Sequence, residues 1–157
     1  MRRRAAAIFL MATVLPCDGA RAGQSDPMCA PIQAFVSSVK PNETRQIAFH
    51  TSWGSNFKNS PAPAISAKQC LHHDYPQAKV LCAYLMAHGA VEFSGNNAQR
   101  ALVCLSPGTR FNERVQLAQG EFSFYYGTEQ RGSNVTITYA QDPKLGGMVL
   151  AIEADGY

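Results

Sequence analysis

The stretch SNVTITYAQ, residues 133–141, indicates the fold class of this 157-residue chain. Val135, Ile137 and Tyr139 alternate with small or polar residues. A repeat of two is typical of a β-strand with one face against a core. A second alternating stretch, GGMVLAIEADGY at residues 146–157, follows directly. Because strands joined by short turns pair antiparallel, the C-terminal part predicts an antiparallel sheet.

Working outward from this stretch, other segments predict further strands. Residues 43–53 alternate around Ile47 and Phe49. Residues 90–94 and 98–106, separated by Gly-Asn-Asn, resemble a hairpin, and residues 113–127 resemble another that turns near Gln119 and Gly120. We therefore expect a sheet of about six strands.

Two segments have helical periodicity instead. In residues 30–40, Ile32, Phe35, Val36 and Val39 recur at the spacing of one helical face, and Pro41 ends the segment. Residues 75–89 form the second expected helix, with Asp74 as N-cap, Pro76 in the first turn and Gly89 at the end. Residues 54–67 between strand and helix are rich in Gly, Ser, Asn and Pro and predict a long loop. The expected architecture is an α+β domain with two helices packed on one face of the sheet.

The first 22 residues resemble a secretory signal peptide. Arg2–Arg4 precede an apolar run, and Ala20-Arg21-Ala22 fits a cleavage site. This run is shorter than the ~20 residues that a helix needs to cross a bilayer, so we do not expect the chain to be an integral membrane protein. Cleavage leaves residues 23–157 as a single α+β domain in the periplasm or outside the cell.

Charge and cysteine content follow from that cleavage. The first 22 residues hold four of the 14 basic and one of the 11 acidic residues, so ten of each remain. A neutral chain without a basic cluster is a poor partner for nucleic acid.

The four remaining cysteines are Cys29, Cys70, Cys82 and Cys104, and in an exported chain they are expected to form two disulfides. Four cysteines allow three connectivities. We favour Cys29–Cys70 with Cys82–Cys104, because Cys82 falls in a predicted helix and Cys104 in a predicted strand.

Residues 70–82, CLHHDYPQAKVLC, contain a possible metal or catalytic cluster. Adjacent His72 and His73 do not fit the usual zinc spacing, and oxidised cysteines are neither ligands nor nucleophiles. A nucleophile elbow of the G-x-S-x-G type is absent from the sequence. We therefore expect no cofactor, no metal and no catalytic residue, and interpret this stretch as the entry to a helix.

Two aromatic stretches are candidate binding surfaces. HTSWGSNF, residues 50–57, places Trp53, Asn56 and Phe57 where a strand meets the long loop, although Trp53 could instead belong to the core. In FSFYY, residues 122–126, Tyr125 is expected on the open face of the sheet with Tyr139 from a neighbouring strand.

These patterns predict a small exported binding protein that catalyses nothing. It would be an inhibitor or immunity-type protein that occludes the surface of a partner, either a protein or a component of the cell envelope. One alternative is a cell-envelope hydrolase that uses His50 or the pair His72 and His73. Another is a periplasmic metal-binding protein that uses those histidines.

Overall fold

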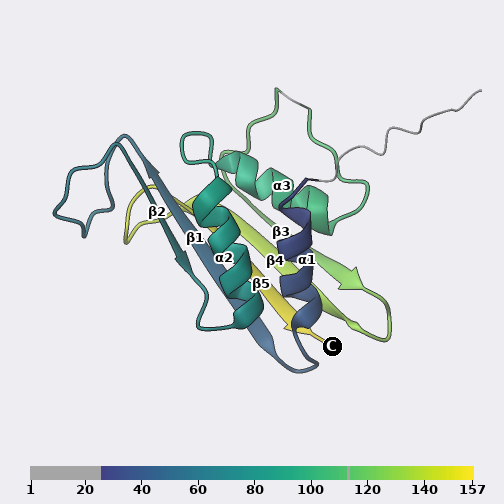
Figure 1. The fold of residues 1–157 in the computed structure, drawn as a ribbon. Coiled ribbons are helices and arrows are strands. Elements are labelled where there is room, and N and C mark those ends of the chain that lie inside the picture. The colour runs from purple at the N-terminus through teal and green to yellow at the C-terminus, as the bar shows by residue number, and fades with distance from the viewer. Residues whose placement is uncertain (1–25, 113) are drawn as a thin grey trace, which may run out of the picture.

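The structure, a computed structural model, describes residues 26–157 apart from residue 113. These residues form a five-stranded antiparallel sheet with three helices on one face (Figure 1). The elements follow in the order α1 (Cys29–Ser38), β1 (Thr44–Trp53), β2 (Ser66–Leu71), α2 (Pro76–His88), α3 (Gly95–Leu105), β3 (Gly120–Gly127), β4 (Gly132–Gln141) and β5 (Met148–Gly156). The spatial order of the strands is β2-β1-β5-β4-β3, so β2 and β3 are the edges. The expected α+β class and the antiparallel sheet are confirmed.

The core lies between the sheet and the helices. Ile47 of β1 pairs with Ile152 of β5, which pairs with Ile137 of β4, and all three are fully buried. Phe35 of α1 is fully buried within the same apolar cluster. Burying a side chain of this size contributes about 1.5–3 kcal/mol. The alternation in residues 133–141 therefore identified the buried face of β4 correctly.

The expected hairpin at residues 90–106 is wrong, because residues 95–105 form helix α3. Its buried side chains recur at helical spacing, at Ala98, Ala101, Leu102 and Leu105. That spacing of three and four residues is the repeat of a helix face. Residues 114–118, expected as a strand, form none. The described residues therefore have three helices and five strands, in place of the expected two and six.

Strand β2 was not predicted, because its residues were assigned to a loop and a helix entry. It is an edge strand in which Cys70 pairs with Phe49 of β1. None of its residues is fully buried, so its sequence carries no strong alternation. Helix α2 confirms the expected helix, with Pro76 in its first turn. Asp74 is not the N-cap: Tyr75 holds that position without a side-chain cap. None of the helices in the described part of the chain is long and apolar enough to cross a bilayer.

The four expected cysteines form two disulfides, but the favoured pairing is wrong. Cys29 is bonded to Cys104, and Cys70 to Cys82. The first bridge joins α1 to α3, because Cys104 lies in a helix beside α1 and not in a strand. The second joins edge strand β2 to α2. Disulfides of this kind are typical of chains that fold in an oxidising compartment.

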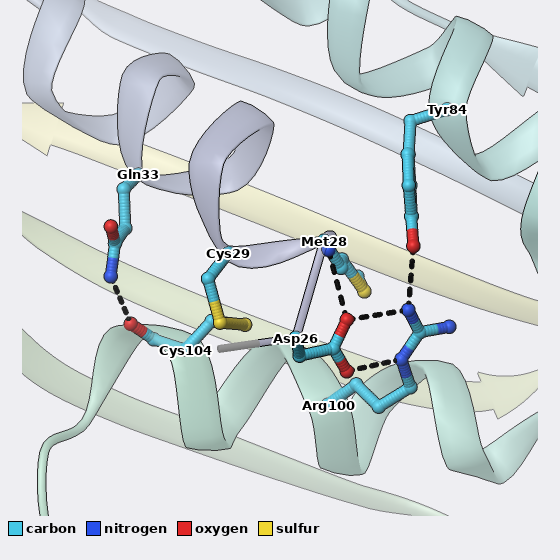
Figure 2. The surroundings of a disulfide bond; sticks show 7 residues. All are labelled: Asp26, Met28, Cys29, Gln33, Tyr84, Arg100 and Cys104. Carbon is cyan, nitrogen blue, oxygen red and sulfur yellow. Dashed lines mark hydrogen bonds and ion pairs between the residues drawn. A yellow bond between two sulfur atoms is a disulfide. The ribbon is translucent and has the colours of Figure 1, made fainter. Parts of the chain in front are cut away.

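An ion pair lies beside the first disulfide (Figure 2). The guanidinium of Arg100 donates two hydrogen bonds of 2.6 Å to the carboxylate of Asp26 and one of 2.7 Å to the hydroxyl of Tyr84. The hydrogen bond from Arg100 outweighs partial burial and holds the pKa of Asp26 below its ordinary value. The same carboxylate raises the pKa of Arg100. This network and the disulfide together fix the start of α1 against α2 and α3.

Candidate functional site

A long loop, residues 54–65, joins β1 to β2 and projects beyond the layer of helices at the left of Figure 1. Gly54 begins it with a φ of 81°, a conformation that favours glycine. Trp53 precedes it and is 54% exposed, while Ile65 ends it and is 76% exposed. Two large apolar side chains therefore face solvent at the two ends of one loop. The alternative of Trp53 as a core residue is wrong.

Asn56 braces the loop from within. Its side-chain amide donates to the hydroxyl of Ser60 at 2.8 Å and to the carbonyl of Ala62 at 2.7 Å. Its side-chain carbonyl accepts a hydrogen bond from the N–H of Phe57 at 2.8 Å. One asparagine thus connects both halves of the loop. Phe57 itself is half-buried.

Lys58 fastens the loop to the turn between β4 and β5. Its backbone N–H donates to the carbonyl of Leu145 at 2.8 Å, and its ammonium donates to the carbonyl of Pro143 at 3.0 Å. The aliphatic part of Lys58 lies over Gly146, which has a φ of 79°. The positive charge of this loop is therefore used in an internal contact.

Asp142 organises that turn and ties it to β1. One carboxylate oxygen accepts hydrogen bonds from the N–H groups of Lys144 and Leu145, at 2.8 and 3.0 Å. The other lies 2.7 Å from Nδ1 of His50, and both side chains are buried. Burial alone would raise the pKa of Asp142, but the hydrogen bonds from Leu145, Lys144 and His50 together lower it. Asp142 was not among the site residues predicted from the sequence, although an Asp-Pro pair four residues before a Gly-Gly pair is a turn signal.

The pair of His50 and Asp142 has part of the geometry of a nucleophilic hydrolase. In such enzymes the carboxylate holds one ring nitrogen while the other accepts a proton from a nucleophile. Here Nε2 of His50 is buried and has no partner in the described part of the chain. A hydroxyl or thiol nucleophile at hydrogen-bond distance is therefore missing among these residues. In the described residues the pair is a strut that ties β1 to the turn between β4 and β5, to which Lys58 of the loop is bonded.

The two histidines of residues 70–82 form no hydrogen bond with His50 or Asp142 in the part of the chain that the structure describes. His72 accepts a hydrogen bond from the N–H of Asp74 at 3.1 Å, and His73 is exposed with a φ of 46°. Within residues 26–157, residue 113 aside, no group of three or more His, Cys, Asp or Glu side chains converges as a metal site would require.

The two candidate aromatic surfaces are separate. Tyr125 is 79% exposed and packs edge-on against Tyr157, with ring centroids 6.4 Å apart. Its row across the sheet runs through Asn134 and Asp155 to Thr44. Trp53 lies nine residues further along β1, about 30 Å away at the usual rise. The expected exposure of Tyr125 is confirmed, but it does not adjoin the loop.

Tyr139 does not lie on the open face, and that expectation is wrong. Its side chain is 4% exposed and belongs to the buried row of β4 with Ile137. Its hydroxyl bonds to that of Ser94 at 2.6 Å, which satisfies both groups in the interior. Residues of β4 with odd numbers face the helices, so Tyr139 is a core residue.

Comparison with other proteins gives no relative: no family model, curated protein or solved structure matches this chain.

Proposed function

We propose that this chain is a small exported binding protein, periplasmic or secreted, that inhibits a partner protein by covering its surface with loop 54–65. The observation that carries the proposal is the pair of exposed apolar side chains, Trp53 and Ile65, at the ends of a braced loop. The hydrogen bonds of Asn56 and Lys58 hold the backbone between them.

Bracing favours binding for an entropic reason. Ordering a flexible loop on association costs affinity, and a loop that already holds its bound shape avoids much of that cost. Tryptophan is enriched among the residues that dominate interface energies, and these residues lie in well-packed pockets of the partner. A projecting loop with Trp53 at its start can reach a concave site on another protein.

The chemistry of the loop favours an apolar pocket on the partner. Lys58 is the charged residue of residues 54–65, and its ammonium is bonded to Pro143. The loop therefore carries a single positive charge on an otherwise uncharged surface, and a strongly ionic partner such as nucleic acid would gain little from it.

Export is supported by two features. The N-terminal pattern fits a signal peptide that ends at Ala22, although these residues lie outside the part that the structure describes. The two disulfides agree with folding in an oxidising compartment.

The test is a capture experiment with matched variants. Mature chain immobilised through its C-terminus is incubated with periplasmic extract, and bound proteins are quantified by mass spectrometry. We expect one protein to be captured by the wild type and lost with the double variant Trp53→Ala, Ile65→Ala. The control is Val80→Ala with Met86→Ala, which removes two apolar side chains of comparable exposure from the outer face of α2.

The outcome separates loop binding from general stickiness. Capture that survives in the control but not in the loop variant supports the proposal. Equal capture by both double variants would show that the loop is not the binding element. Inhibition is then tested by adding wild type or loop variant to the captured protein and measuring its activity.

A further inference from the structure

Strand β3, GEFSFYYG at residues 120–127, is an unprotected sheet edge. In the part of the chain that the structure describes it pairs with β4 alone, without a bulge from Gly120 to Gly127 (Figure 1). Natural edges are usually short or carry lysine, proline or a bulge, because a bare edge recruits another strand. β3 has eight residues, with Glu121 as its one charge. The other edge, β2, is shorter and carries Lys68.

The register shows which backbone groups of β3 face outward. Thr128 and Arg131 exchange both of their backbone hydrogen bonds at the hairpin turn. Hydrogen-bonded pairs of an antiparallel ladder recur at every second residue. The N–H and C=O groups of Glu121, Ser123 and Tyr125 therefore point away from β4. They offer three donors and three acceptors along the edge.

A twofold register with its axis at Ser123 makes this edge complementary to itself. If two copies pair antiparallel about a twofold axis at Ser123, Glu121 of each copy lies opposite Tyr125 of the other. The six groups of Glu121, Ser123 and Tyr125 are then used, and no two like charges are opposed. An axis at Glu121 would instead oppose two carboxylates.

Side chains on both faces of β3 gain from the same pairing. Phe122, Phe124 and Tyr126 are half-buried at the edge of the core, and Tyr125 is exposed on the other face. In the twofold register Phe122 of each copy lies opposite Phe124 of the other. With at most about 70 Å² left on each of the three half-buried aromatic side chains and roughly 170 Å² on Tyr125, the pairing would bury at most about 800 Å² of side-chain surface in two copies. That area is below the usual size of a stable specific interface, so a weak, concentration-dependent dimer is expected.

The overall charge also favours a second copy as the occupant. Residues 23–157 carry ten basic and ten acidic side chains, so two copies do not repel each other through net charge. The geometry points to a homodimer in which two β3 edges join into one ten-stranded sheet centred on Ser123. Loop 54–65 lies at the opposite edge of the sheet, so both loops stay accessible in the dimer. The inference does not depend on the proposed inhibitor function.

The experiment uses charge at the twofold axis. Molar mass of the mature, oxidised chain is measured by sedimentation equilibrium over a range of concentrations. We expect the wild type to approach dimer mass, and Ser123→Lys and Ser123→Glu each to weaken the dimer about tenfold or more, because like charges then face each other. Mixing the two variants should restore a dimer. Thr136→Lys is the matched control, because Thr136 pairs with Ser123 on the same face but one strand inward.

Several results would overturn the inference. A wild type that stays monomeric up to its solubility limit excludes self-pairing and leaves the edge to another protein. A dimer that Ser123→Lys leaves intact uses a different surface. Failure of the mixture to recover, or equal weakening by Thr136→Lys, would show that the axis does not lie at Ser123. Circular dichroism confirms that each variant is folded.

Discussion

The two disulfides should stabilise the fold unequally, and the difference follows from their loop lengths. Cys29 and Cys104 are 75 residues apart in sequence, and Cys70 and Cys82 are 12 apart. In the chain-entropy model a bridge restricts the unfolded chain more when it closes a longer loop, which gives about 4.5 kcal/mol for the first and about 2.8 kcal/mol for the second. Removing the first should therefore cost about 1.7 kcal/mol more.

Two double variants, with both cysteines of one bridge replaced by alanine, measure this difference. Their packing losses are matched, since each bridge has one buried and one half-buried cysteine. The free energy of unfolding is obtained from urea titration monitored by circular dichroism, with the denaturant slope fitted for each variant. Equal losses, or a larger loss without Cys70–Cys82, would refute the entropic reasoning and assign the stabilisation to contacts in the folded state.

Three further predictions concern loop 54–65, the turn between β4 and β5, and the ion pair at the start of α1. Asn56→Ala should expose the loop to trypsin at its one lysine while lowering the free energy of unfolding by only about 1 kcal/mol, and an unchanged cleavage rate would contradict the bracing role. Asp142→Ala should cost about 3 kcal/mol in urea denaturation, because it leaves Nδ1 of His50 and two backbone N–H groups without an acceptor; a cost below about 1 kcal/mol would argue against the strut. The pKa of Asp26 is lowered from 3.8 by Arg100, so its stabilisation is present above pH 3.8 and is lost as the pH falls through the lower value of the folded state. The difference in unfolding free energy between wild type and Asp26→Asn, about 1–3 kcal/mol at pH 7, should therefore shrink toward pH 2, and a constant difference would exclude the ion pair as its source.

Strong periodicity explains what the sequence predicted about the fold. The alternation around Ile137 and the helical spacing around Phe35 each reflect a long element with one buried face, and both elements form as expected. In residues 98–106 two repeats compete: Leu102 and Cys104 alternate, while Ala98, Ala101 and Leu105 have helical spacing. The helical repeat is the one that buries more side chains, and alanine is the best helix former.

The disulfide pairing could not be predicted, because it depends on which elements pack together. The expectation that Cys82 pairs with Cys104 assumed that residue 104 lay in a strand. Once residues 95–105 are helical, Cys104 faces α1 and its partner is Cys29. An error in one element thus changed both bridges.

The candidate site was predicted in part. Glycine, proline and asparagine in residues 54–65 indicated a loop, and Trp53 marked its start. The contact between His50 and Asp142 joins residues 92 positions apart, and no local pattern predicts such a pair. Tyr139 shares its repeat of two with the buried Val135 and Ile137, so the sequence already contained the signal that places it in the core.

The most direct test of the central claim is hydrogen–deuterium exchange of this chain with and without its captured partner. If the braced loop is the binding element, amides of residues 53–65 should gain protection in the complex, while the outward amides of β3 should exchange as in the free protein at the same concentration. Protection confined to β3, α2 or the open sheet face, with residues 53–65 unchanged, would contradict the account.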